Sequence, residues 1–139
     1  MALQATQLTV GTAHEAVIVD NLTRTQIVQY AGASGDYNPL HTDEIFATQV
    51  AGYPSVFAHG MLTMGMTGRM LTDYVGDGRL RSFGGRFTNQ VWPGDTLRAS
   101  ATVTSVEATN DEMIASFDVV TTNQDGTVVF SGTASAHVD

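Results

Sequence analysis

The stretch from Phe57 to Val75 constrains the fold of this chain more than any other. It carries no formal charge before Arg69. Small or apolar residues recur at spacings of four and three, the period of a helix: Phe57, Met61, Met64, Gly68, Leu71 and Val75. Further methionines and leucines lie off this stripe, which is typical of a helix buried on most sides. At about 1.5 Å per residue it would be roughly 27 Å long, so we expect a central helix with a curved sheet wrapped around it.

The rest of the chain supplies that sheet. Turn-forming residues divide the C-terminal half into four predicted strands, near residues 79–90, 96–107, 112–122 and 126–137. A short strand is expected at Ala16–Val19. A helix is expected over Leu22–Ala31, because Thr23 followed by Gln26 is a capping-box pattern. The sequence therefore predicts one α+β domain over residues 1–139, with about five or six antiparallel strands around a central helix.

Composition excludes several classes of function. The chain has 139 residues, a net charge of −8, no lysine and no cysteine. Disulfides, cysteine zinc sites and thiol nucleophiles are therefore excluded, and general binding to nucleic acid or an anionic membrane is disfavoured. Polar residues interrupt the apolar stretch at 57–75, which argues against a membrane span. No signal peptide is apparent at the N-terminus, so a cytoplasmic location is expected.

Asp36 and His41 form the first candidate catalytic pair. They are five residues apart across a loop containing Pro39, so both side chains could point into one cavity. An aspartate beside an imidazole can activate water and move protons on and off carbon. The structural alternative is that Asp36 caps a turn and His41 lies on the surface.

His59 and Gly60 form the second candidate, at the start of the central helix. The first N–H groups of a helix have no partner within it, and Gly60 would let a ligand approach closely. Its N–H could stabilise an enolate-like oxyanion. The alternatives are that Gly60 serves only helix–sheet packing and that His59 is a packing or hydrogen-bonding residue rather than a catalyst.

Taken together, these residues resemble a known family. The run Ser34-Gly35-Asp36-Tyr37-Asn38-Pro39-Leu40-His41 resembles the signature of the MaoC-like (R)-specific enoyl-CoA hydratases, also called hydratase 2. Ala58-His59-Gly60-Met61 resembles the start of that family's central helix. The length matches a single hot-dog domain. Within the family, residues 58–65 and 74–77 are most similar to the catalytic β-type subunit of actinobacterial (3R)-hydroxyacyl-ACP dehydratases of type II fatty-acid synthesis.

The resemblance implies a role for each matching residue. Asp36 and His41 would hold the water that adds to the β-carbon, and the Gly60 N–H would polarise the thioester carbonyl. Asn38 would brace the loop, with Ser34 as a second supporting residue. One position departs from the pattern: some hydratases carry a serine where this chain has Gly68, so a hydrogen bond from that position is not expected.

The resulting interpretation is a hydratase that adds water reversibly and stereospecifically to trans-2-enoyl thioesters of CoA or acyl carrier protein. The acyl chain would run beside the central helix, with Met61, Met64 and Met66 as candidate lining residues. No cofactor is expected, and the histidines show no metal-ligand spacing. The alternatives are a hot-dog thioesterase and a non-catalytic partner subunit. An open sheet edge predicts a homodimer or a heterodimer with a related subunit, with the active site near the boundary.

Arginine supplies all of the positive side-chain charge. Four of the six arginines fall between residues 69 and 86: Arg69, Arg79, Arg81 and Arg86. They are either an ion-paired solvated face or a docking site for phosphate. In a strand, period two places Arg79 and Arg81 on one face and Arg86 on the other. We therefore expect Arg79 or Arg81 to bind phosphate and Arg86 to be a paired structural residue.

Overall fold

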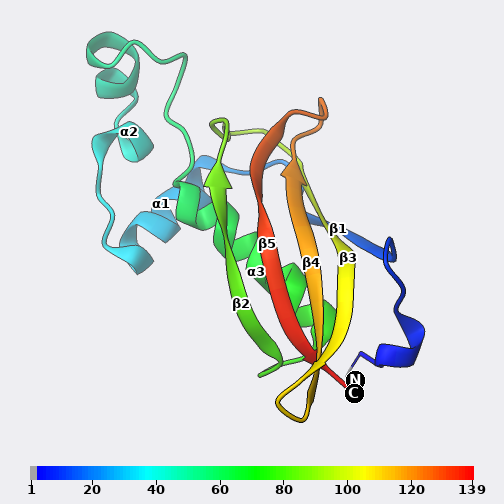
Figure 1. The fold of residues 1–139 in the computed structure, drawn as a ribbon. Coiled ribbons are helices and arrows are strands. Elements are labelled where there is room, and N and C mark those ends of the chain that lie inside the picture. Colours follow the sequence, from blue (N-terminus) through cyan, green and yellow to red (C-terminus); the bar gives the residue numbers. More distant parts are fainter. Residues whose placement is uncertain (1–2) are drawn as a thin grey trace.

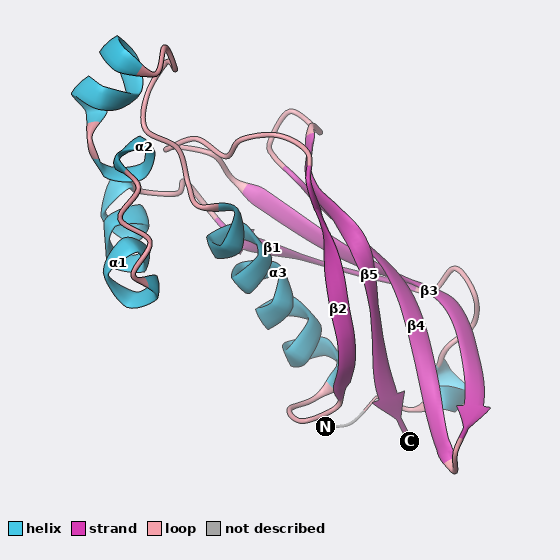
Figure 2. Ribbon diagram, turned by 60° about the vertical axis from the view of Figure 1, so that its left-hand side comes forward, coloured by secondary structure: helices cyan, strands magenta, loops and turns pink. Residues whose placement is uncertain are grey.

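A computed structural model describes residues 3–139 and shows the hot-dog arrangement expected from the sequence. One antiparallel sheet of five strands has the order β1-β3-β4-β5-β2, and α3 lies along one of its faces (Figures 1 and 2). The strands are β1 (Ala13–Val19), β2 (Leu80–Phe87), β3 (Leu97–Thr109), β4 (Glu112–Thr122) and β5 (Val128–Val138). The four C-terminal strands lie where the turns predicted them.

The main core lies between α3 (Gly60–Val75) and the inner faces of the three central strands. Many of the strand residues that face the helix are alanines, and these small side chains leave room for the helix backbone. The buried members from the strands are Ala99, Ala101, Val103, Ala115, Phe117, Val119, Phe130, Ala134, Ala136 and Val138. A second, smaller cluster around Leu22, Ile27 and Leu97 lies at the other end of the sheet. Each fully buried large apolar side chain contributes roughly 1.5–3 kcal/mol.

The central helix differs from the prediction in its start and in its buried face. It begins at Gly60 with His59 as the N-cap, so Phe57 lies in extended chain ahead of it. Its buried residues are Thr63, Thr67, Met70, Leu71 and Val75, whereas Met61 is 55% exposed. Thr67 can be buried because its hydroxyl has hydrogen-bond partners at the Thr63 carbonyl (2.9 Å) and the Thr121 hydroxyl (2.7 Å). The spacing of apolar residues along the sequence does not predict this hydrogen-bonded pair of buried threonines, Thr67 and Thr121.

Between β1 and α3 the chain leaves the sheet and forms the outer segment, residues 24–57, which projects from one end of the molecule (Figure 1). It contains α1 (Arg24–Ser34), α2 (Pro39–Thr42) and the π-helix η2 (Phe46–Val50). The predicted capping box is present at Thr23 and Gln26, and Gly35 ends α1 in the left-handed conformation that glycine adopts without strain. A short 3-10 helix, η1 (Ala5–Gln7), precedes β1.

Within residues 3–139 no helix is long and apolar enough to cross a membrane. The cytoplasmic location expected from the sequence stays a prediction.

Candidate active site

The loop between α1 and α2 is held by short-range hydrogen bonds. The Ser34 hydroxyl accepts from the Asp36 N–H at 3.2 Å, and Asp36 Oδ1 accepts from the Asn38 N–H at 3.2 Å. Asn38 is the N-cap of α2, and its side chain accepts from the Leu40 N–H at 3.0 Å. His41 therefore lies inside a one-turn helix. The next cap is Asp43, whose Oδ1 accepts from the Phe46 N–H.

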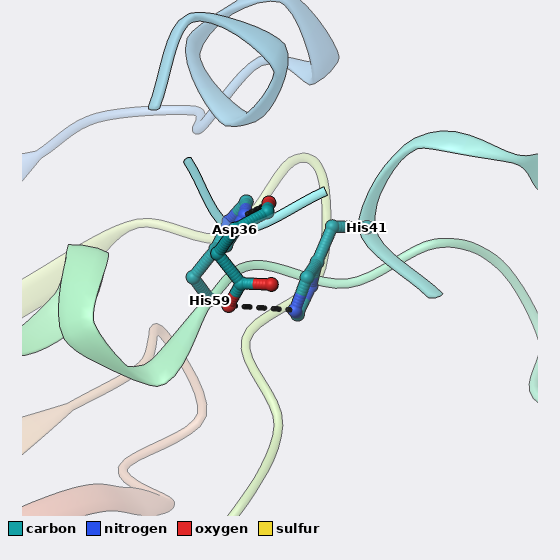
Figure 3. A group of neighbouring side chains, drawn as sticks. All are labelled: Asp36, His41 and His59. Carbon is teal, nitrogen blue, oxygen red and sulfur yellow. Dashed lines mark hydrogen bonds and ion pairs between the residues drawn. The ribbon is translucent and has the colours of Figure 1, made fainter. Parts of the chain in front are cut away.

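His41 and Asp36 face each other across a short gap (Figure 3). His41 Nε2 lies 3.9 Å from Asp36 Oδ2, too far for a direct hydrogen bond. A water about 2.8 Å from each atom would fit between and beside them. The His41 residue is 9% exposed and the Asp36 side chain 54% exposed. The predicted pair is thus brought together, with one member fixed in protein and the other open to solvent.

A backbone contact determines the tautomer of His41. Its Nδ1 lies 2.6 Å from the carbonyl oxygen of Phe57. Because a carbonyl only accepts, Nδ1 carries the proton and donates. In the neutral ring, Nε2 then has a free lone pair directed toward Asp36. This is the atom that can take a proton from water or return one to carbon.

His59 also belongs to this site, although the sequence favoured a packing role for it. Its ring stacks on His41 with centroids 3.8 Å apart and planes 21° apart, and its Nε2 donates to the Asp36 carbonyl at 3.0 Å. The His59 Nδ1 is buried with no hydrogen-bond partner among residues 3–139. Burial is the main cause that lowers the pKa of His59, against the opposing effect of the bond to Asp36. Tyr30 meets the ring edge-on.

These three side chains also make the one grouping in residues 3–139 that could hold a metal ion, with ligand atoms of Asp36, His41 and His59 within 4.8 Å of one another. Sequence spacing does not reveal this grouping because the residues come from three different segments. The geometry fits a metal poorly. The His59 Nε2 is used by a carbonyl, its Nδ1 is buried, and stacked rings cannot converge their nitrogens on one ion.

Gly60 is the first residue of α3, and its N–H has no partner within that helix. It lines a cleft of about 290 Å³, the Gly60 cleft, together with Phe57, Thr63, Phe87 and residues 88–91. A Cβ on Gly60 would lie 2.9 Å from the ring of Phe87, so this position also needs glycine for packing. The two roles considered from the sequence, an N–H donor open to a ligand and a residue needed for close packing, are therefore compatible at Gly60. Thr63, also in this cleft, has a buried hydroxyl with no partner in the described chain.

A larger cleft of about 640 Å³ lies on the other side of the helix, between β1, α1 and α3. It reaches the site through Tyr30 and contains Met66. Met66 was one of three predicted lining residues, and the other two have different surroundings: Met61 is exposed, and Met64 packs against the main core. Gly68 lies close to Phe83, whose ring would be 3.3 Å from an added Cβ. The missing side chain there serves close packing in this chain.

The arginines that form ion pairs are not the ones that the sequence predicted. Arg79 pairs with Asp139 at 2.5 Å and Arg81 with Glu112 at 2.8 Å, whereas Arg86 has no ion-pair partner in the described part of the chain. The expectation that Arg86 is paired was therefore wrong. Its side chain lies on the face of β2 opposite Phe83 and Phe87, which pack toward α3. Arg79 and Arg81 lie at the far end of α3 from His59, where their ion pairs favour the solvated-face alternative.

The chain belongs to a known family, since residues 5–125 match the MaoC like domain. This is the MaoC-like dehydratase and (R)-hydratase family. The chain is 42% identical over 87 residues to 3-hydroxyacyl-thioester dehydratase Y of Mycobacterium tuberculosis, covering 60% of this chain and 30% of that protein. It is 37% identical over 101 residues to enoyl-CoA hydratase ChsH3 of the same organism, covering 70% and 32%.

Among solved structures, an (R)-hydratase from A. caviae involved in PHA biosynthesis superposes with a TM-score of 0.84 and 26% identity, over 97% of this chain and 100% of that one. The chain thus spans the whole of this structural relative. It spans only about a third of the length of the two curated relatives.

Proposed function

We propose that this protein catalyses the reversible, stereospecific hydration of trans-2-enoyl thioesters to (3R)-3-hydroxyacyl thioesters. The observation that carries the proposal is the 3.9 Å separation of His41 Nε2 and Asp36 Oδ2, beside the N-terminus of α3. This spacing lets both atoms touch one water. The Gly60 N–H is the donor that would face the thioester oxygen. The names of the two curated relatives, a 3-hydroxyacyl-thioester dehydratase and an enoyl-CoA hydratase, support an acyl thioester as the substrate.

In the hydration direction, the water oxygen bonds to C3 of the enoyl group while one water proton passes to the dyad of Asp36 and His41. The electron pair of the C2–C3 double bond moves toward the carbonyl, where the Gly60 N–H stabilises the enolate oxygen. A proton from the dyad then reaches C2. The dyad takes one proton and gives one back, so it returns to its starting state. Dehydration follows the same steps in reverse. Which of the two residues acts as base and which as acid is left to experiment, since a coupled pair shares its titration.

The proposal extends to the setting of the reaction. The similarity of residues 58–65 and 74–77 to catalytic β-type dehydratase subunits favours a role in type II fatty-acid synthesis or polyester metabolism, on CoA or acyl-carrier-protein thioesters. The purified chain should hydrate enoyl-CoAs of graded length, followed by loss of the enoyl absorbance and by chiral analysis of the product. Release of free thiol without hydration would identify a thioesterase instead. Activity only after a related chain is added would identify a heterodimer.

We also propose that two copies pair through the exposed edge strand β2. An unpaired strand edge is normally covered, and Phe87 on this strand is 47% exposed while it lines the Gly60 cleft. Pairing there would place the active site near the subunit boundary. Light scattering should give twice the mass of the chain. A stable and active monomer would contradict this proposal.

A further inference from the structure

We propose that His59 is the positioning residue of this site, the single side chain that fixes both members of the dyad relative to the Gly60 N–H. The inference rests on the proposed hydration activity and assigns His59 a role within it.

The first argument is that His59 is not needed for helix capping. It is the N-cap residue of α3, with extended backbone at φ −61° and ψ 138°, yet its side chain makes no capping hydrogen bond. Serine, threonine, aspartate and asparagine are the residues that usually occupy such a position. The ring points instead toward the outer segment, and the residue is only 2% exposed.

The second argument is that His59 contacts both members of the dyad, by two different means. Its Nε2–H donates to the Asp36 carbonyl at 3.0 Å, across 23 positions of sequence. Its ring face stacks on the ring of His41 at 3.8 Å. The other contacts of the Asp36 backbone N–H and carboxylate are to near neighbours in its own loop. The bond from His59 therefore joins this loop to the start of the helix that carries Gly60, in addition to the contacts of Leu40 and His41 with Phe57.

The third argument is electrostatic. The titratable groups that face His59 are Asp36, His41 and Tyr30. A proton on Nδ1 would place a buried donor where no partner exists and a charge against the face of His41. The dyad gains and loses protons during turnover. A neutral His59 is compatible with this, because it places no charge of its own against the ring of His41.

Two substitutions separate the contacts. His59→Phe keeps a ring against His41 and loses the donor to Asp36, whereas His59→Gln keeps an amide donor and loses the ring. We expect His59→Phe to lower kcat for enoyl-CoA hydration by about tenfold or more with KM nearly unchanged, by analogy with the roughly 10–100-fold effect of residues that orient the ligands of a metal site. His59→Gln should recover part of the loss.

Stability separates positioning from packing. His59→Phe removes a buried nitrogen that has no partner among residues 3–139 and also the hydrogen bond to the Asp36 carbonyl, two effects of opposite sign, so its Tm should change little while its kcat falls. His14 offers a matched control, because it also stacks on an aromatic ring, Tyr74, with centroids 4.2 Å apart, but outside the site. His14→Phe should leave kcat unchanged.

The panel also includes the parent and Asp36→Asn. If the parent hydrates enoyl-CoA, Asp36→Asn does not, and His59→Phe keeps full kcat, the positioning role is refuted while the proposed function stands. A kcat loss accompanied by a lower Tm and no recovery in His59→Gln would show that His59 is a packing residue. A parent without hydratase activity would overturn the function and the inference together.

Discussion

Polar or charged side chains lie near both ends of α3, but their surroundings are opposite. At the N-terminal end, His59 and Thr63 are buried, and each keeps one polar atom without a partner among residues 3–139. Near the C-terminal end, Arg79 and Arg81 lie on the surface and are matched by Asp139 and Glu112. Native proteins rarely leave buried polar atoms unpaired. The contrast supports the proposal that the chemistry takes place at the N-terminal end, and it favours an ordinary charged surface at the C-terminal end.

The largest expected effect tests the N-terminal end directly. Asp36→Asn and His41→Ala should each lower the hydration rate by at least about 10²-fold, the scale of general acid–base groups, or roughly 2.7 kcal/mol in the barrier. Both residues lie in the outer segment, away from the main core, so circular dichroism should show a folded protein. Near-parental turnover in either variant would disprove the assigned mechanism.

A second prediction compares two threonines one turn apart on α3. Because Thr67 gives its single hydroxyl proton to the Thr63 carbonyl, the Thr121 hydroxyl must donate to Thr67 Oγ1. Thr67→Val leaves the buried Thr121 hydroxyl unpaired and should lower the free energy of unfolding by about 1–3 kcal/mol. Thr63→Val removes an unpaired hydroxyl and should be neutral or stabilising. Urea denaturation measures both, and a larger loss for Thr63→Val would show that its hydroxyl has a partner after all.

The smallest effects are expected at the C-terminal end. Arg79 and Arg81 hold the pKa values of Asp139 and Glu112 below their usual range, and His137 lies near both carboxyls. Lowered carboxyl pKa values stabilise the fold above the unfolded-state pKa, about 4, and this contribution is lost as pH falls through the folded pKa. Arg81→Ala should therefore lower Tm slightly at pH 7 and hardly at all at strongly acidic pH.

The same variants test the phosphate assignment made from the sequence. Since Arg79 and Arg81 are ion-paired, we expect Arg79→Ala and Arg81→Ala to change KM for enoyl-CoA little, and Arg86→Ala serves as the unpaired comparison. A clear rise of KM in Arg79→Ala or Arg81→Ala, with kcat intact and with weaker salt dependence than in the parent, would restore the docking interpretation.

Local signals in the sequence determined much of this protein. The capping box at Thr23, the turns that bound the C-terminal strands and the long apolar stretch each act within a few residues, so their structure follows from the residues themselves. The pairing of Asp36 with His41 was predictable for the same reason, since the two residues are only five positions apart in the sequence.

Only the tertiary structure decided which face of α3 is buried, which residues His59 contacts and which arginines are ion-paired. Each depends on a partner distant in sequence: Thr121 for Thr67, Asp36 for His59, and Asp139 and Glu112 for the arginines. Burying a polar group costs free energy unless a partner satisfies it, and these partners are supplied by distant parts of the chain. Which polar residues are buried is therefore decided by the packing of the whole chain, which no local pattern of residues encodes.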